Sequence, residues 1–486
     1  MHVMGYIAVS FMIVPLIVFT IVNLLPKKAA GRISLFLAGS GALIQIAASV
    51  AEIFLLAGAD LHEYEFSLLW DIKKVGSERF AISSLSLAIL FCIGFVAFVS
   101  VLIANKTIEK RRITYVNLLM ILILGMNGMV IVTDLFSLYV FLEVVGISSF
   151  VLIAMFKSET GLEGAFKYLV MSALASIFIL TGLSFIFMQT GGLQYSTVGR
   201  AVTQKEFSQP ILEYAALTLL IAGFAIKTGA APFHSWLPDA HQSANTAVSV
   251  LLSGIVIKVA GIYGFIVLTK LFRDVPGVNT VLAVMGTVTI LTGALLALRQ
   301  THFKRIVAYS SVSQMGYILL GISTGSTLGL VGAVVHIFNH ATFKCTLFSN
   351  AAALHEQTGT LDINEMGGLQ KRMPVTNFSS VSAFLSTAGI PPFAGFWSKL
   401  LIILALWGAN MRGYAAIALF SSILTAAYFL RVQKKVFFGK LSDKYSEIRE
   451  IGGSIKFAEI MLTIVMIAVG TGFPLVLLYL NGRGIL

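Results

Sequence analysis

The chain is built from apolar runs of about the length that crosses a lipid bilayer, separated by short polar stretches. Hydrophobic residues make up 57% of the 486 residues and charged residues only 12%, whereas a soluble domain is about one quarter charged. The sequence lacks the alternating segments of about ten residues that are typical of a membrane β-barrel. It therefore predicts an all-α polytopic membrane protein.

We expect about fourteen spanning helices, two of them broken. The first apolar segment, 6–25, is too long for a signal peptide and is not followed by a cleavage site. None of the connecting stretches is long enough for a soluble domain, so we predict one membrane domain over 1–486. The helices are expected near 4–25, 33–57, 81–104, 114–132, 135–156, 165–189, 212–241 (broken), 245–272, 278–298, 303–322, 326–353, 375–409 (broken), 413–438 and 457–480.

The net charge of +12 comes mostly from basic residues in short loops. Odd-numbered loops hold many of them, such as Lys27, Arg111 and Lys440, whereas even-numbered loops hold few, such as Arg200. This bias predicts that the odd loops face the cytoplasm and that both termini lie outside. It also argues that the positive charge sets the membrane orientation and does not bind nucleic acid.

Recognisable cofactor and metal motifs are missing from the sequence. Cys92 and Cys345 both fall inside predicted helices, and no Cys/His cluster has the spacing of an iron–sulfur or zinc site. Neither a Walker A motif nor a dinucleotide fingerprint occurs. We therefore expect no cofactor and no redox centre in this chain.

The stretch 224–265 carries a lysine in the middle of each of two apolar segments, Lys227 and Lys258. A lysine at the centre of a membrane helix costs about 2.5–3.5 kcal/mol on insertion scales. The turn between the segments, rich in Gly and Pro, frees backbone groups that lipid could not satisfy, so it must be buried or line a wet cavity. Broken helices with ionisable groups near the midplane are typical of ion paths.

A short internal echo predicts a repeat. The segment GAAPFHSW (229–236) resembles GIPPFAGFW (389–397), with Lys227 before the first and Lys399 after the second. The two broken helices have opposite expected orientations, as an inverted repeat requires. We therefore pair helices 4–8 with helices 9–13, as two inverted five-helix repeats. The expected division is 1–110 for flanking helices 1–3, 111–272 for the first repeat, 273–440 for the second repeat and 441–486 for helix fourteen.

Glu143 is the one clear carboxyl group that we expect deep in a helix, and Lys227 is its natural partner. The pair is either a clamp between two helices or a switch, because separating it drives the buried lysine to release its proton. Lysine suits this role, since burial readily lowers its proton affinity. The alternative for Lys227, Lys258 and Lys399 is that they reach an interface by snorkelling.

His336 and His340 stand four residues apart, on one face of a predicted helix, and Lys344 follows one turn later. A relay is favoured because histidine changes charge near neutral pH. A metal site is the weaker alternative, because no third ligand is evident.

The candidates fall into two groups. The proton-transfer group is Glu143, Lys227, Lys258, His336, His340 and Lys399. The candidate relay group is Lys167, His234, His241, Lys304 and Lys344. Snorkelling, helix capping, turn stabilisation and loop charge are the structural alternatives for the relay group.

Seven stretches between 134 and 399 resemble a known family: the antiporter-like proton-translocating subunits shared by respiratory complex I, Mrp cation/proton antiporters (their D-type member) and membrane-bound group 4 hydrogenases. The stretches are DLFSLYVFLEVVGISSFVLI, GAFKYLVMSALAS, KTGAAPFHSWLPDAH, SVLLSGIVIKVAGIYG, KRIVAYSSVSQMGY, HIFNHATFKCTLF and AGIPPFAGFWSK.

This resemblance implies fourteen core helices, of which the seventh and twelfth are broken, and a polar axis along the membrane midplane. It implies that Glu143 pairs with Lys227, that Lys258 and the His336/His340 region relay protons, and that Lys399 connects to the far side or to the next subunit. It also implies a prokaryotic inner membrane, neighbouring antiporter-like and small membrane subunits, and peripheral redox subunits with iron–sulfur centres.

The favoured function is a proton-translocating subunit of a complex whose partners carry out the redox chemistry, without a redox centre of its own. The main alternative is a D-type subunit of a gradient-driven sodium/proton antiporter. Sodium needs hard oxygen ligands, and intramembrane Asp and Glu are scarce here, so protons are favoured as the ion. A quinone-reducing enzyme and a non-pumping scaffold subunit are less well supported: cofactor ligands are missing, and the full set of lysines is present.

Overall fold

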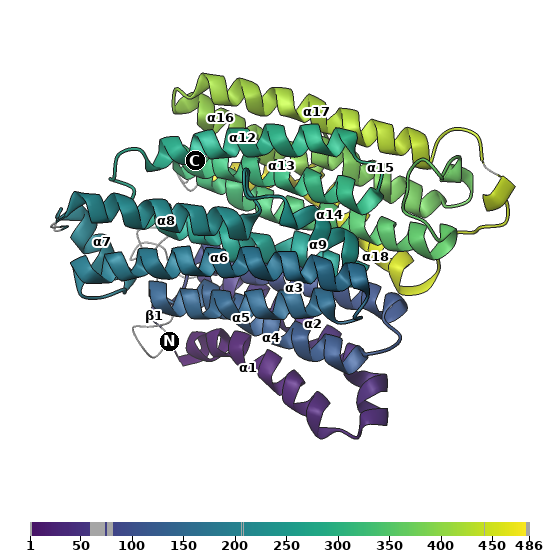
Figure 1. Ribbon diagram of the computed structural model, residues 1–486, viewed down its shortest axis with the longest axis horizontal. Coiled ribbons are helices and arrows are strands. Elements are labelled where there is room, and N and C mark those ends of the chain that lie inside the picture. The colour runs from purple at the N-terminus through teal and green to yellow at the C-terminus, as the bar shows by residue number, and fades with distance from the viewer. Residues whose placement is uncertain are drawn as a thin grey trace. The chain divides into compact units, whose positions relative to one another are not determined.

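The computed structural model describes residues 2–58, 73–74, 81–205, 207, 209–441 and 443–482, and it is helical almost throughout (Figure 1). Two π-helical segments, η2 (Leu252–Val256) and η3 (Lys258–Ile262), lie between α10 and α11. A pair of two-residue strands, β1 (Lys73–Lys74) and β2 (Ala81–Ile82), is antiparallel. The helices are α1 (His2–Leu24), α2 (Lys27–Gly58), α3 (Ser84–Thr107), α4 (Arg112–Ile131), α5 (Leu135–Ala154), α6 (Glu159–Thr190), α7 (Tyr195–Thr203), α8 (Pro210–Thr228), α9 (Trp236–Ser243), α10 (Thr246–Leu251), α11 (Tyr263–Leu271), α12 (Val278–Arg299), α13 (Phe303–Ser323), α14 (Thr327–Thr358), α15 (Pro374–Ala388), α16 (Ala394–Gly408), α17 (Arg412–Val436) and α18 (Gly453–Gly482), with short 3-10 turns η4 (Leu369–Lys371) and η5 (Asp443–Tyr445).

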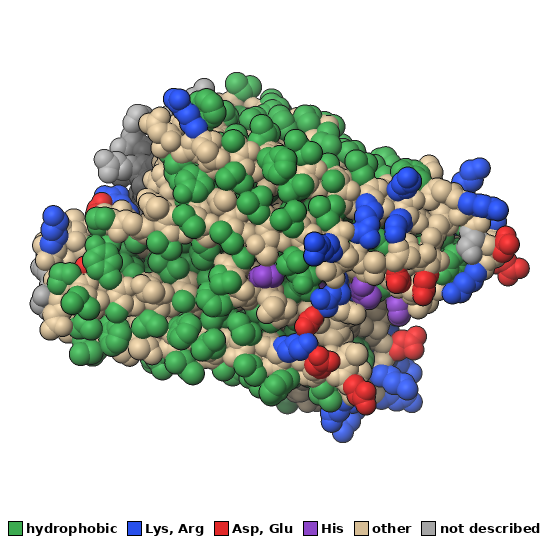
Figure 2. All heavy atoms as spheres, turned by 45° about the horizontal axis from the view of Figure 1, so that its top comes forward, with side chains coloured by type: hydrophobic (Ala, Val, Ile, Leu, Met, Phe, Trp, Pro, Cys, Tyr) green, Lys and Arg blue, Asp and Glu red, His purple; other side chains and the backbone are tan. Residues whose placement is uncertain are grey.

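The predicted membrane fold is confirmed. Each of the fourteen predicted segments coincides with one helix or with consecutive helices, and 11 described helical segments are long and apolar enough to span a bilayer. Large apolar side chains lie exposed on many of them, including Phe36 (74%) and Met188 (70%), and Figure 2 shows broad areas of hydrophobic side chains. Such surfaces suit contact with lipid. Sequence reasoning missed the short helix α7.

Both predicted helix breaks are present. Helix α8 ends at Gly229 (φ 68°) and α15 ends at Gly389 (φ 83°), the left-handed conformation that glycine adopts most easily after a helix. Hydroxyl groups satisfy backbone groups freed at the breaks: Ala231 N donates to Thr289 Oγ1 at 3.1 Å, and Gly395 N donates to Ser386 Oγ at 3.2 Å. The breaks are therefore tolerated inside the membrane because protein side chains take up the backbone hydrogen bonds.

Contacts group the chain into two compact units. The first comprises Met1–Phe98, Lys110–Gly229 and Val256–Asn279, and the second comprises Val99–Glu109, Ala230–Ile255 and Thr280–Leu486. The predicted division into flanking helices and two repeats stays a prediction.

In the first unit, α5, α6 and α8 lie side by side (Figure 1). Small residues allow this close approach, because a Cβ at Gly182 would lie 3.0 Å from Ala216 O and a Cβ at Gly223 would lie 3.0 Å from Ala175 O. Glycine contacts of this kind drive helix packing where the hydrophobic effect is weak. They bring α6 and α8 close together.

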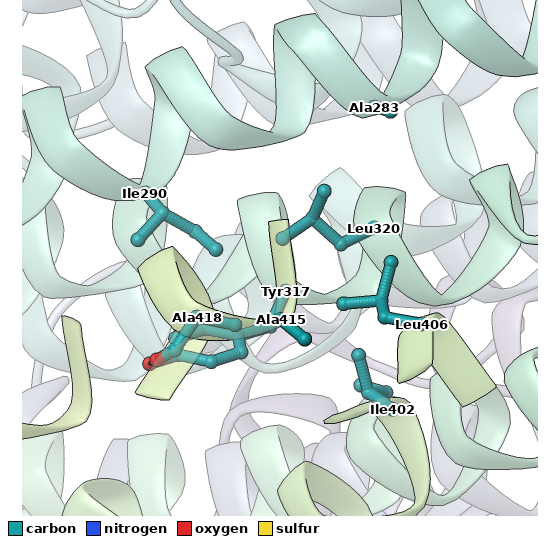
Figure 3. Packing of buried hydrophobic residues seen from close by; sticks show 8 residues of the cluster. All are labelled: Ala283, Ile290, Tyr317, Leu320, Ile402, Leu406, Ala415 and Ala418. Carbon is teal, nitrogen blue, oxygen red and sulfur yellow. Dashed lines mark hydrogen bonds between the residues drawn. The ribbon is translucent and has the colours of Figure 1, made fainter. Parts of the chain in front are cut away.

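In the second unit, α14 contacts α13, α15, α16 and α18. An apolar cluster joins α12, α13, α16 and α17 beside it (Figure 3). Its members are Ala283, Ile290, Tyr317, Leu320, Ile402, Leu406, Ala415 and Ala418. The cluster fixes the helices that carry Tyr317 and Lys399.

Replacing Gly470 of α18 by alanine is expected to destabilise the second unit by about 1–3 kcal/mol, the usual cost of overpacking. A Cβ at Gly470 would meet Pro392 O and lie 2.6 Å from Ala394 N, both backbone atoms that cannot move away alone. Gly472→Ala is the matched control, because a Cβ at Gly472 meets nothing within 4 Å. The measurement is the unfolding temperature in detergent, and equal temperatures for the two variants would contradict this packing.

Candidate functional site

The centre of the first unit holds an ion pair between Glu143 of α5 and Lys227 of α8, with a Nζ–Oε1 distance of 3.5 Å. Two serines of α6 join it: Lys227 Nζ donates to Ser172 Oγ at 2.7 Å and to Ser176 Oγ at 3.4 Å, and Ser176 Oγ donates to Glu143 Oε1. The predicted partners Glu143 and Lys227 therefore lie together. The two serines that complete the network were not predicted from the sequence.

Local structure aims these side chains at one another. Asp134 caps the N-terminus of α5 by accepting from Ser137 N at 2.7 Å. Gly146, one turn after Glu143, leaves the space that the network occupies, since a Cβ there would lie 3.1 Å from Ser172 Oγ and 3.4 Å from Lys227 Nζ. Lys227 stands in the last turn of α8, just before the break, where a positive charge suits the negative end of the helix dipole.

The two charges differ in their access to solvent. The Lys227 side chain is 2% exposed and the Glu143 side chain is 30% exposed. A buried ammonium group needs a countercharge, because removing one partner of a buried pair leaves an uncompensated charge. The arrangement can hold a proton on Lys227 while Glu143 is near and favour its release when Glu143 moves away.

Lys258 lies at the start of η3, is 1% exposed and belongs to the same unit. The turn that carries it packs against the end of α8, because a Cβ at Gly261 would lie 2.6 Å from Thr228 N and 2.7 Å from Thr228 Cα. π-helical turns are rare and are frequent at functional sites. Lys258 therefore sits on an element in contact with the residue that follows Lys227.

In the second unit, α14 carries His336, His340 and Lys344 on buried turns. His336 Nδ1 lies 2.9 Å from Ser398 Oγ, and the two histidine rings are 6.5 Å apart. Lys344 Nζ donates to Val307 O at 2.8 Å and to Ser310 Oγ. The predicted relay residues thus form a polar row along one buried helix.

Lys399 of α16 follows this row, directly after Ser398. Its ammonium group lies 4.2 Å from the centre of the Tyr317 ring and 3.3 Å from Ser422 Oγ. Tyr317 in turn donates to Ala418 O at 2.7 Å and lies 5.8 Å from the His336 ring, centre to centre. A cation over an aromatic face is stabilised without a carboxylate. The two lysines therefore differ in what stabilises their charge: a carboxylate for Lys227 and an aromatic ring for Lys399.

The remaining candidates have structural partners. Lys304 Nζ donates to Ala244 O at 2.8 Å, which ends α9. His241 stacks on Phe348 with ring centres 5.0 Å apart, and His234 lies 6.2 Å from the Tyr309 ring. Lys167 is 43% exposed and pairs with Glu163 at 2.7 Å. Their relay roles stay predictions.

The expectation that Glu143 is the one clear carboxyl deep in a helix is wrong. Glu459 of α18 is completely buried and Glu52 of α2 is 4% exposed. Glu459 Oε1 accepts from Asn350 Nδ2 at 2.6 Å, and Glu459 Oε2 lies 3.0 Å from Thr376 Oγ1. Glu459 is the third residue of the predicted segment 457–480, so its position suggested the membrane interface. The signal that could have found it is the run of Ser and Thr over 376–387, which gives this helix several polar side chains for a buried carboxyl group to contact.

The sequence matches a family profile described as "NADH:quinone oxidoreductase/Mrp antiporter, TM" over residues 132–425. It is 35% identical over 311 residues to NADH-quinone oxidoreductase subunit N of Desulforudis audaxviator, a match that covers 63% of this chain and 62% of that relative. It is 33% identical over 359 residues to the D-type subunit of the Na(+)/H(+) antiporter of Alkalihalophilus pseudofirmus, covering 74% of this chain and 71% of the relative. The fold is similar to a chain in the structure of the membrane-bound sulfane sulfur reductase, an archaeal respiratory membrane complex, with a TM-score of 0.86, 29% identity and coverage of 98% of this chain and 96% of that chain.

Proposed function

This chain belongs to the NADH:quinone oxidoreductase/Mrp antiporter family of membrane subunits, and we propose that it translocates protons as one subunit of a multi-subunit membrane complex. Similar proteins are subunits of a quinone oxidoreductase and of an antiporter. The sequence relationship therefore supports a partnership with other membrane subunits. In the favoured form of the proposal, peripheral partners with iron–sulfur centres carry out the redox chemistry.

The observation that carries the proposal is the Glu143–Lys227 pair, held by Ser172 and Ser176 next to a broken helix. A movement of α5 against α8 changes the distance between the two charges. Because the attraction between charges rises as water is excluded, a shift of one side chain at this site changes the stability of the ammonium form strongly. Redox chemistry in a partner then acts through this movement, and no electron needs to enter the chain.

The proposed route uses the two polar groupings in sequence. Lys227 exchanges protons with Lys258 in the first unit. His336, His340 and Lys344 continue the path in the second unit, and Lys399 is its far end. The partners described above for Lys227, His336, Lys344 and Lys399 support the route, because they hold these side chains in place.

The membrane orientation belongs to the same proposal. The basic residues of the odd-numbered loops support a cytoplasmic position for these loops and an outer position for both termini. Membership of this family supports the inner membrane of a prokaryote. A fusion of a periplasm-sensitive and a cytoplasm-sensitive reporter to each terminus measures the orientation directly.

The second candidate is a D-type subunit of a gradient-driven sodium/proton antiporter. The 33% identity to such a subunit across 74% of this chain favours it. The proton path through this chain is the same in both cases. The candidates differ in the energy source, which lies in the partners.

The first experiment is affinity purification of the native protein from its membrane, with mass spectrometry of the proteins that come with it. Iron–sulfur subunits support the redox-driven pump, and only small membrane subunits with other antiporter-like chains support the exchanger. Reconstitution of the purified complex in vesicles with a pH-sensitive dye then tests the function itself. A complex that moves no protons under either a redox couple or a sodium gradient would contradict the proposal.

A further inference from the structure

A second polar centre lies in the second unit, where α14, α15 and α18 meet. Glu459 of α18 is completely buried, and so are Asn350 of α14 and Thr376 of α15. Asn350 Nδ2 donates to Glu459 Oε1 at 2.6 Å and to Ser379 Oγ at 2.7 Å. The family match ends at residue 425, so Glu459 lies outside the matched region.

The hydroxyl of Thr376 lies between two carboxyl groups, with Oγ1 2.8 Å from Glu450 Oε1 and 3.0 Å from Glu459 Oε2. A threonine hydroxyl has one proton to donate. If both glutamates were ionised, one of these contacts would bring two lone pairs together in a buried place. One of the two carboxyl groups must therefore supply a proton.

Glu450 has the surroundings of a carboxylate. It accepts from Val375 N at 2.6 Å, from Thr376 N at 3.3 Å and from Ile451 N at 3.1 Å. Val375 and Thr376 stand in the first turn of the 15-residue helix α15, where free N–H groups and the helix dipole favour an anion.

Glu459 has the surroundings of a neutral acid. None of the ion pairs found among the described residues includes it, and an isolated ionised carboxylate is very costly to bury. The proton thus belongs on Glu459 Oε2, which donates to Thr376 Oγ1, while Thr376 donates to Glu450. Asn350 Oδ1 is buried without a hydrogen-bond partner, so the centre also has an acceptor ready for a further donor such as water.

We propose that Glu459 is a proton-loading site, filled from the loop at Glu450 through the hydroxyl of Thr376. Loading moves one proton from a Glu450 carboxylic acid to Thr376 while the hydroxyl proton of Thr376 moves to the Glu459 carboxylate. The number of protons is conserved and Thr376 ends as it began. A cavity of about 540 Å³, lined by Asn105, Lys106, Glu356, Ile451, Gly453 and Ser454, adjoins this loop next to Glu450. In this proposal, water in the cavity carries protons from solvent to Glu450.

The site lies near the proposed proton route. Asn350 is six residues after Lys344 on α14, which is roughly 9 Å along a helix axis. The loops before α15 and α18 are both odd-numbered, so the orientation proposed above makes this an uptake site for cytoplasmic protons. This inference adds an uptake site to the proposed function. It rests on the proposed function for the claim that the proton loaded on Glu459 is then translocated.

Infrared spectroscopy of the purified complex tests the loading site without relying on transport. The complex is expected to have a carbonyl band of a neutral carboxylic acid that disappears in Glu459→Gln and persists in Glu447→Gln, an exposed glutamate of the same loop. After transfer to heavy water the band should shift at least about tenfold more slowly in Thr376→Val, which lacks the bridging hydroxyl. If the wild type lacks this band, or if sodium ions abolish it, the inference that Glu459 is a proton-loading site is wrong.

Proton transport by the same variants tests whether the loading site at Glu459 contributes to translocation. Glu459→Gln keeps the shape of the side chain but cannot exchange a proton, so translocation should fall by about tenfold or more, while Glu447→Gln behaves as the wild type. Normal translocation by Glu459→Gln would overturn the inference and leave the proposed function intact. A wild-type complex that translocates no protons would instead contradict the proposed function, whereas the infrared band would still report on Glu459.

Discussion

A complex carrying Lys227→Ala is expected to assemble but to translocate protons about 100-fold more slowly or worse, the usual loss when a positioned proton donor is removed. Lys227 is the basic member of the pair with Glu143 and donates to Ser172 and Ser176. Without its ammonium group, the network has no group that can take the proton and pass it on. The measurement is the initial rate of acidification in reconstituted vesicles.

Assembly of this variant is expected because Glu143, the partner left behind, retains 30% exposure of its side chain. A carboxyl group with solvent access can be hydrated or protonated. Losing its partner therefore destabilises the protein less than it would for a fully buried carboxyl group. Lys434→Ala is the control, because Lys434 is an exposed lysine in the last turn of α17. Unchanged translocation by Lys227→Ala, with an intact complex on a native gel, would remove the central claim.

The helices were predictable from the sequence because the membrane leaves few alternatives. Every backbone group in lipid must bond within the chain, so an apolar run of sufficient length becomes a helix. The breaks at 229–235 and 389–393 were predictable because each combines a glycine with one or two prolines beside a lysine in an apolar run. A single proline is a weaker signal, since Pro15 and Pro474 lie inside α1 and α18. The π-helical turn η3, which begins at Lys258, was not, because no local residue pattern signals it; in the fold it packs against α8.

The charged members of the candidate site were also predictable, because a lysine or glutamate in an apolar run has no other simple explanation. Their neutral partners were missed. Ser172, Ser398 and Tyr317 are common residues of membrane helices, and only the fold reveals that they face Lys227, His336 and Lys399. Glu459 was missed because its place in the sequence suggested a helix end, whereas the neighbouring helices α14 and α15 cover it.

Lys399→Arg is expected to abolish translocation as completely as Lys399→Ala, although it keeps the positive charge. The ammonium group lies 4.2 Å from the centre of the Tyr317 ring, and a guanidinium group can occupy the same aromatic face. Arginine, however, is not deprotonated in proteins. If Lys399 must release a proton, charge alone does not rescue transport, and the loss should again be about 100-fold or more.

This comparison separates a group that passes protons from one that only stabilises α16. A purely structural Lys399 would be replaced well by arginine, so the variant would then keep both its assembly and its transport. Arg412→Lys is the matched control, because Arg412 is an exposed residue whose guanidinium lies 5.3 Å from the centre of the Trp407 ring. Exchanging one cation for the other there should leave transport unchanged. Wild-type rates in Lys399→Arg would show that a fixed charge suffices, and the end of the proton route would have to be sought elsewhere in the second unit.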